Sequence, residues 1–431
     1  MSKSKLLSLA LCVILLLLSA FPAFADEATL ESKRAILLGE PTELICVSKL
    51  GDTGRYPENS AEGVAAAFEQ GADMVLIYLR KTSDGQIVLF SDENLKRMCA
   101  DAQSNSIDKN INDVTFEELS TYFLRNGKGG EHEKLTAYSV STFDETLKLL
   151  GGGKLLLIDG AWDFRDEVCE ILEKNNAMLD AVILTDARKG AIKSWLGDRA
   201  SSPIVFSKYV GTVIWSSKSY IRGSVNAGAA GVMLASGNPY STTFSTSVVS
   251  KTRGKLRAMI DMTDKKLCGK RDDTETYWDD VTSRGFSVIV TDRVEELNLY
   301  KQRVELSRRN LSELIDRAKQ LDDSTLSTYW ANKLNSNILK ATDALSYSVS
   351  ALELDNFYNE LNSVVVSLSD SNLRNRGTLT VSTGRIFAAA LVIIAFVAFE
   401  LYMERMRNKR IALRRKGIDK KGRYRLKNKG E

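Results

Sequence analysis

Proton-transfer chemistry is what this sequence restricts most, because its 431 residues include one histidine, His132. Catalysis by two histidines, in which one imidazole accepts a proton and the other donates one, is therefore excluded. His132 lies in the polar stretch 127–133, among glycines and charged residues. That setting is typical of a solvated loop histidine and gives little support to a displaced catalyst.

The cysteines do not form a metal-binding motif either. Cys46, Cys99, Cys169 and Cys268 are far apart in the sequence, whereas thiolate zinc sites repeat a short spacing between cysteines. The sequence leaves open whether these residues form one or two disulfides or stay reduced. An apolar run surrounds Cys46, and this also fits a thiol packed in the core.

A series of short motifs runs in a fixed order from residue 47 to residue 293. The motifs are Gly51, Tyr56-Pro57-Glu58-Asn59, Gly71-Ala72-Asp73, Thr82-Ser83-Asp84-Gly85, Ser91-Asp92 with Leu95 and Arg97, the run 141–147, Leu157-Ile158-Asp159 and the run 285–293. This series resembles the glycerophosphodiester phosphodiesterase family over about residues 42–300. The resemblance implies a barrel of the TIM (β/α)8 type, as in other phospholipase C-like phosphodiesterases.

The family's chemistry, as the resemblance implies it, is metal-assisted hydrolysis of a phosphodiester. It needs two histidines, carboxylates that hold a divalent cation such as Ca²⁺ or Mg²⁺, and an Arg and a Lys that neutralise the phosphate. In this chain Lys49 and Ser91 occupy the histidine positions, Leu76, Tyr78 and Asp159 the metal-ligand positions, and Leu50 and Ala161 the positions of the Arg and the Lys. The resemblance therefore predicts the fold of the family without the side chains that the family uses for catalysis.

Four of these residues are candidates for binding a ligand, namely Lys49, Tyr78, Ser91 and Asp159. The Lys49 ammonium could attract a phosphate or carboxylate group, or it could be solvated or paired with an acidic side chain. The spacing gives no support to a nucleophilic pair of Ser91 with Lys49. We name no catalytic residue and no metal ligand, and a single carboxylate at Asp159 predicts no bound cofactor.

The elements that would position these residues alternate in a regular way. Apolar runs typical of strands lie at 44–47, 74–78, 87–90, 155–158, 181–184, 204–206, 231–235, 256–261 and 288–291. Helical segments between them include 60–70, 142–150 and 165–175. This alternation over residues 40–300 predicts one α/β barrel of about eight strand–helix units with parallel strands.

The sequence pattern changes after Asp292, because apolar residues then recur at helical spacing. Three stripes, centred on Leu314, Ala341 and Leu361, predict a three-helix stalk over residues 301–370. The run 314–319 with Leu321, followed by Tyr329-Trp330, resembles the FIVAR modules of surface proteins of Gram-positive bacteria. That resemblance implies a spacer or interaction module.

The two ends of the chain predict export and anchoring. Residues 1–25 have the layout of a signal peptide: Lys3 and Lys5, an apolar run, and Ala23-Phe24-Ala25 as the cleavage site. After a polar linker at 371–385, the apolar run 386–403 precedes the basic tail 404–431. Basic residues directly after an apolar helix mark the cytoplasmic side of a membrane, so we expect a single-pass protein with the barrel outside.

The charge distribution agrees with this topology. The tail has thirteen Lys or Arg against three acidic residues, a net charge of +10, whereas residues 26–403 have 44 against 52, a net charge of −8. An acidic exterior argues against a nucleic-acid partner.

Three hypotheses follow. The first is a cell-surface pseudoenzyme that binds a phosphorylated polyol, a lipid-derived ligand or a cell-wall ligand. The second is an active phosphodiesterase of lipid or wall metabolism, with an altered mechanism and a divalent cation. The third is a structural platform whose function lies in the stalk or the tail.

Overall fold

The computed structural model describes residues 34–35, 37–38, 42–197, 203–321 and 326–369. The predicted signal peptide 1–25, linker 371–385, membrane helix 386–403 and tail 404–431 lie outside these ranges and stay predictions. Within the described ranges, no helix is long and apolar enough to cross a membrane.

Eight parallel strands close into a barrel. They are β1 (Ile45–Lys49), β2 (Met74–Lys81), β6 (Leu155–Asp159), β7 (Ala181–Thr185), β8 (Ile204–Val210), β9 (Gly231–Ala235), β10 (Arg257–Asp261) and β11 (Val288–Thr291). Each strand pairs with the next in this order, and β1 pairs with both β2 and β11, so the sheet has no free edge. The predicted TIM-type barrel is confirmed.

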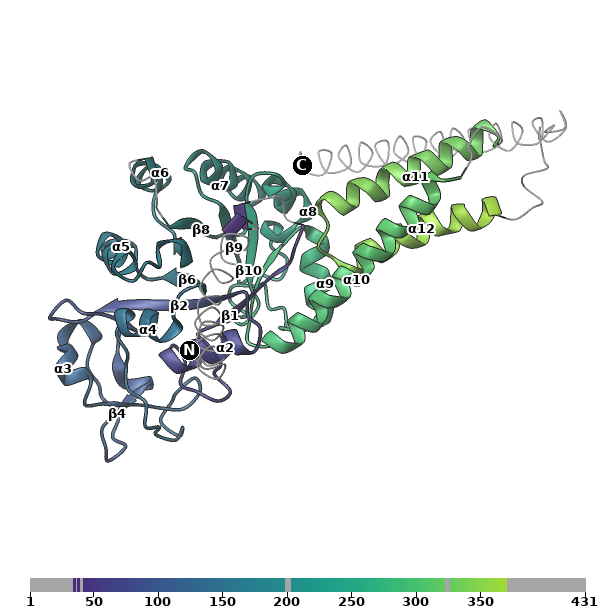
Figure 1. Ribbon diagram of the computed structural model, residues 1–431. Helices are drawn as coiled ribbons and strands as arrows, with labels where there is room; N and C mark the ends of the chain where they lie inside the picture. Colours follow the sequence, from purple (N-terminus) through teal and green to yellow (C-terminus); the bar gives the residue numbers. More distant parts are fainter. Residues whose placement is uncertain (1–33, 36, 39–41, 198–202, 322–325, 370–431) are drawn as a thin grey trace, which may run out of the picture. The chain divides into compact units, whose positions relative to one another are not determined.

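A helix follows each barrel strand and covers its outer side (Figure 1). The eight helices are α2 (Ala61–Glu69), α4 (Phe143–Leu150), α5 (Arg165–Lys174), α6 (Lys189–Gly197), α7 (Ile214–Asn226), α8 (Thr246–Val249), α9 (Glu275–Arg284) and α10 (Val294–Lys319). Local sequence sets where α4 begins. Thr142 and Glu145 form a capping box, in which each side chain accepts a hydrogen bond from the other residue's backbone N–H.

The apolar run predicted as a strand at 87–90 forms β3 (Ile87–Leu89), which pairs antiparallel with β2 and is not part of the barrel. It opens an insertion between β2 and α4. The insertion also contains η1 (Leu95–Arg97), β4 (Cys99–Ala100), η2 (Ile111–Asp113), α3 (Phe116–Leu119) and β5 (Phe123–Leu124). Apolar side chains such as Leu95, Met98 and Leu124 give it a small core of its own.

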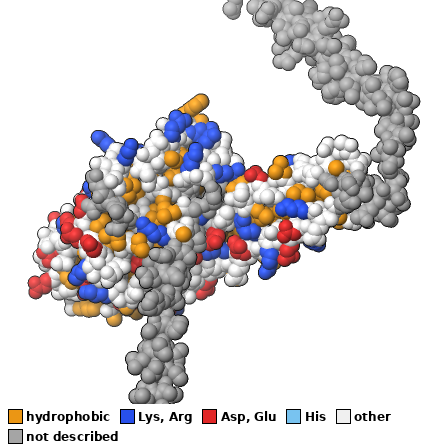
Figure 2. Space-filling model, turned by 45° about the horizontal axis from the view of Figure 1, so that its top comes forward, with side chains coloured by type: hydrophobic (Ala, Val, Ile, Leu, Met, Phe, Trp, Pro, Cys, Tyr) orange, Lys and Arg blue, Asp and Glu red, His pale blue; other side chains and the backbone are white. Residues whose placement is uncertain are grey.

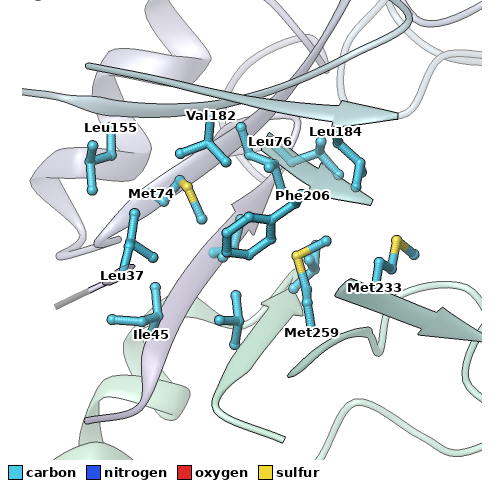
Figure 3. Packing of buried hydrophobic residues seen from close by; sticks show 14 of the residues in the cluster. Leu37, Ile45, Met74, Leu76, Leu155, Val182, Leu184, Phe206, Met233 and Met259 are labelled. Atoms are coloured by element: carbon cyan, nitrogen blue, oxygen red, sulfur yellow. The ribbon is translucent and has the colours of Figure 1, made fainter. Parts of the chain in front are cut away.

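The interior of the barrel is filled by apolar side chains from alternate positions of the strands (Figure 3). Phe206 and Met259 project into it together with Met74, Leu76 and Val182. The packing is tight at one register pair, where a β-carbon added to Gly231 would lie 2.6 Å from the Phe206 ring. The barrel is therefore a packed core, and any site must lie at its ends.

The predicted three helices are α10, α11 (Thr328–Tyr347) and α12 (Ala351–Ser369). α10 is one continuous helix that serves as the last helix of the barrel and then as the first helix of the stalk, so the chain has no break at residue 300. The Arg308 guanidinium joins these parts by donating hydrogen bonds to the Leu345 carbonyl at 2.5 Å and the Thr42 carbonyl at 2.8 Å. The likeness to FIVAR modules stays a prediction.

The chain divides into two compact units. Residues 1–322 and 332–366 form the first, which holds the barrel and most of the three helices. Residues 323–331 and 367–431 form the second, in whose described part the rings of Tyr329 and Trp330 meet edge-on with centroids 5.4 Å apart.

Among the described residues, the four cysteines are free thiols, and all are buried. Cys46 lies inside β1, as expected for a thiol packed in the core. Burial raises the pKa of Cys99 to about 12, so this thiol stays protonated and unreactive at neutral pH.

Candidate functional site

A cavity of about 470 Å³ lies at the mouth of the barrel, where the strands end. Its lining comes from β1, from β2 and the insertion after it, and from the loops that follow β10 and β11. It comprises Lys49, Leu50, Thr53, Glu58, Tyr78, Ser91, Asp92, Arg97, Lys128, Thr263, Asp264 and Asp292. The carboxyl ends of barrel strands are where this architecture builds its active sites. Three of the four candidates named from the sequence, Lys49, Tyr78 and Ser91, thus line one cavity.

Lys49 ends β1 and is held in an ion pair. Its ammonium lies 2.9 Å from Asp261 Oδ2 at the end of β10, and the two side chains are 19% and 2% exposed. The other oxygen of Asp261 accepts hydrogen bonds from the Thr263 hydroxyl at 2.6 Å and the Thr263 backbone N–H at 2.9 Å. Of the two alternatives for Lys49, the structure therefore shows the paired one.

Asp159 ends β6 and does not line the cavity. One of its oxygens lies 3.2 Å from the Lys208 ammonium on β8, and the other accepts the Gly160 backbone N–H at 2.8 Å. The only carboxylate that the sequence left in the family's metal set is thus neutralised by a lysine. This arrangement leaves it poorly suited to a divalent cation.

Tyr78 lies on β2, with Asp159 beside it in the register of β6. Burial raises the pKa of the phenol well above its usual range, and the nearby Asp159 and Asp261 carboxylates raise it further. The phenol therefore stays protonated and can donate a hydrogen bond. Asn59 fixes the backbone of Tyr78, since its side-chain amide donates to the Tyr78 carbonyl at 2.8 Å and accepts from the Tyr78 N–H at 3.2 Å.

The outer cations of the cavity are paired as well. Arg97 forms ion pairs with Glu58 and, at 2.7 Å, with Asp92. Although burial opposes it, hydrogen bonds to these two carboxylates raise the pKa of Arg97 above its usual range. The Lys128 ammonium lies 2.5 Å from Asp292 at the end of β11. The motif residues Glu58, Asp92 and Arg97 thus hold the insertion against the barrel.

Ser91 lines the cavity and has a buried polar atom without a partner. Its Oγ is buried and has no hydrogen bond to any described residue. Its backbone carbonyl accepts the Arg80 guanidinium at 2.8 Å, which fixes the position of the residue. A ligand hydroxyl would satisfy this oxygen once the side chain turned toward the cavity, because the oxygen has almost no accessible surface in this structure.

The remaining family positions carry no polar side chain. Leu76 is 2% exposed and packs in the core of the barrel (Figure 3). Ala161 is fully buried. Among the described residues, no group of three or more His, Cys, Asp or Glu side chains is placed to hold a metal ion. The donors present do not fit the divalent cation that the family uses. His132 is exposed.

Sequence reasoning missed the partners Asp261 and Lys208. Asp261 is the last residue of a predicted strand, and Lys208 follows another by two residues. A charged residue at the carboxyl end of a barrel strand was the signal that could have found both.

Comparison with known proteins gives a family match for part of the chain. Residues 51–202 match the model of the Glycerophosphoryl diester phosphodiesterase family. Residues 51–202 belong to the glycerophosphodiester phosphodiesterase family. No curated protein matches the sequence.

Solved structures of glycerophosphodiester phosphodiesterases are similar to the chain at low identity. A glycerophosphoryl diester phosphodiesterase from Parabacteroides distasonis is 20% identical, with 62% of this chain and 89% of that chain covered and a TM-score of 0.46. The Thermotoga maritima glycerophosphodiester phosphodiesterase is 18% identical, with 59% and 96% covered and a TM-score of 0.44. An Oleispira antarctica phosphodiesterase in complex with the product sn-glycerol-3-phosphate is 17% identical, with 59% and 95% covered and a TM-score of 0.45.

Proposed function

We propose that this chain is a membrane-anchored extracellular protein of the glycerophosphodiester phosphodiesterase family that binds a ligand at the barrel mouth without cleaving it. The observation that carries the proposal is the pair of ion pairs at the strand ends, Lys49 with Asp261 and Lys208 with Asp159. Lys208 neutralises Asp159, the carboxylate that remains of the family's metal set, and Lys49 neutralises the buried Asp261.

The side chains described at the barrel mouth are also poorly suited to proton transfer. An ammonium group that is paired with a buried carboxylate has no lone pair with which to act as a base. The Tyr78 phenol has a raised pKa and is a weak acid. The Ser91 hydroxyl has no neighbouring base among the described residues to activate it. These groups can donate and accept hydrogen bonds, which is what a binding site needs.

The ligand class that we propose is a polyol of lipid or cell-wall origin. The lining of the cavity has three cations, Lys49, Arg97 and Lys128, and four carboxylates, so it offers no net positive charge to a phosphate. Hydroxyls of Thr53, Ser91, Tyr78 and Thr263 are interspersed with these charges. The sequence led us to expect a phosphorylated polyol, a lipid-derived ligand or a cell-wall ligand, whereas this lining favours an uncharged polyol over a phosphorylated one.

A calorimetric titration of the full-length protein in detergent tests the metal half of this proposal. Ca²⁺ or Mg²⁺ is expected to give no saturable heat at millimolar concentrations, and Asp159→Ala is expected to behave in the same way. A saturable site that Asp159→Ala removes would contradict the proposal.

Parallel titrations test the ligand half, with glycerol, myo-inositol and glycerol 3-phosphate as probes. An uncharged polyol is expected to bind, and Ser91→Ala is expected to weaken it about tenfold, because one hydrogen bond is lost. Thr242→Ala, a change in a loop outside the cavity, serves as the matched control. Binding of glycerol 3-phosphate alone, abolished by Lys49→Met, would overturn the choice of ligand class.

A further inference from the structure

One side of the barrel carries a charge opposite to that of the rest of the exported chain. Residues 187–260 include eleven Lys or Arg and one acidic residue, a net charge of +10, within the segment 26–403 whose net charge is −8. This stretch runs from α6 through β8, α7, β9 and α8 to β10. Figure 2 shows Lys and Arg side chains along the upper edge of the barrel, beside a protruding hydrophobic one, with acidic side chains along its left side.

Four cations on this side belong to α6, to the residue before it, and to α7. They are Arg188, Lys193, Lys218 and Arg222. None of them has a carboxylate within ion-pair distance among the described residues. Elsewhere on the barrel such pairs are common, for example Lys81 with Glu167 at 2.6 Å and Lys148 with Asp144 at 2.5 Å. Their charge is therefore available to an anionic partner.

Next to these cations the barrel exposes large apolar side chains. Trp215 is 81% exposed and Tyr240 90%, and Val210 and Val213 are 63% and 56% exposed. A soluble surface gains nothing by presenting two aromatic rings and two valines to water, so a patch of this kind indicates an interaction site. We call the four apolar residues together with the four cations the basic aromatic face.

The apolar part of this face stands on a fixed support. This support consists of the loop from β8 to α7 and the loop from β9 to α8. The second loop is bonded to the first, because Thr243 Oγ1 donates to the Gly211 carbonyl at 2.8 Å and Thr242 Oγ1 to the Thr212 carbonyl at 3.1 Å. The two aromatic side chains are thus presented from one hydrogen-bonded platform.

The helix α7 connects the aromatic and the cationic parts. Trp215 and Arg222 are both exposed and are seven residues apart, so they lie on one face of the helix, with Lys218 between them. The first turn of α7 has no acidic residue, and therefore the positive end of the helix dipole is not neutralised. The exposed face of α7 thus combines an aromatic ring, which suits the membrane–water interface, with cations that can contact anionic head groups.

We propose that the basic aromatic face docks on the surface of an anionic lipid bilayer. Trp215 and Tyr240 enter the interface between water and hydrocarbon, which suits rings with one apolar and one polar side. The four unpaired cations contact anionic head groups. A soluble anionic polymer would use the cations but would not account for the exposed rings and valines.

Vesicle binding of the full-length protein tests this proposal. The protein is held in nanodiscs of phosphatidylcholine and mixed with sucrose-loaded vesicles, either of phosphatidylcholine or of equal parts phosphatidylcholine and phosphatidylglycerol. We expect at least about tenfold tighter co-pelleting with the anionic vesicles. For contact with the protein's own membrane, hydrogen exchange of residues 210–215 and 238–242 is compared between neutral and anionic nanodiscs, and protection is expected in the anionic ones.

Matched variants separate the two parts of the face. Trp215→Ser with Tyr240→Ser, and independently Lys218→Gln with Arg222→Gln, are each expected to weaken anionic-vesicle binding roughly tenfold or more. Leu299→Ser with Leu306→Ser removes exposed apolar side chains from α10 and should change nothing. An unchanged melting temperature for each variant shows that the barrel is intact.

Two outcomes would overturn the proposal. One is equal affinity for neutral and anionic vesicles together with unchanged hydrogen exchange in anionic nanodiscs. The other is loss of binding in the charge variant while the aromatic variant binds as the parent does, since this result would assign the face to a soluble anionic polymer.

Discussion

Lys49 and Lys208 each reach across the barrel mouth to a carboxylate at the end of another strand. The sequence indicated Lys49, Tyr78, Ser91 and Asp159 as the residues of interest, because a resemblance fixes positions along the chain. It could not indicate the pairing, since Lys49 and Asp261 are 212 residues apart and meet only when the barrel closes. Residue types are thus readable from the sequence, whereas their partners depend on the fold.

Asp261→Asn is expected to destabilise the protein by about 2–4 kcal/mol, because it leaves the Lys49 ammonium without its buried counter-charge. Chemical denaturation of the full-length protein measures this loss. The matched control is Asp108→Asn, which breaks the exposed pair with Lys96, with side chains 65% and 61% exposed, and should leave the free energy of unfolding nearly unchanged. Equal losses in the two variants would show that the mouth pair is no stronger than a surface pair.

Asp180 predicts a pH dependence of stability. Burial raises the pKa of this carboxyl to about 6, against an ordinary value of 3.8. Between these two pH values the folded protein binds the proton more tightly than the unfolded chain, so stability falls as pH rises through this window. Asp180→Asn should remove that fall and gain on the order of 2 kcal/mol at pH 7. Denaturation curves of both proteins at pH 4 and pH 7 check this, and a fall of the same size in the variant would assign it to other groups.

At the scale of elements, apolar runs located every strand of the barrel to within a few residues. They did not distinguish β3 from the barrel strands, because an antiparallel neighbour and a barrel strand have the same apolar pattern. Continuity of α10 was also missed, although its buried residues follow one stripe at heptad spacing, from Val294 through Val304 to Ala318. The periodicity thus predicts which elements form, and the packing decides where each belongs.

Gly231→Ala tests how tightly these elements pack. The added methyl group would lie within 2.6 Å of the Phe206 ring, so we expect a loss of about 1–3 kcal/mol in the free energy of unfolding. The backbone of Gly231 needs no left-handed conformation, and therefore the cost is steric. Phe206→Leu in the same chain should recover part of it, as a double-mutant cycle would measure. Additive losses would mean that the two side chains do not compete for space.

For the whole molecule, the family motifs and the strand–helix alternation together predicted the barrel. The proposed export and anchoring depend on residues 1–25 and 386–403, which lie outside the described ranges. A chain tagged at its C-terminus is expected to lose its barrel, but not its tag, when intact cells are treated with trypsin. Deletion of residues 386–403 should release the protein into the medium. Digestion of the tag on intact cells would contradict the proposed orientation.

The barrel mouth is proposed to bind a ligand without hydrolysing a phosphodiester, and an assay of turnover decides this. Phosphorus NMR follows glycerophosphoethanolamine incubated with a stoichiometric amount of the full-length protein, with Ca²⁺ or Mg²⁺ present. We expect the diester resonance to keep its intensity over days. A growing phosphomonoester resonance that requires the metal ion and disappears in Asp159→Ala would contradict it.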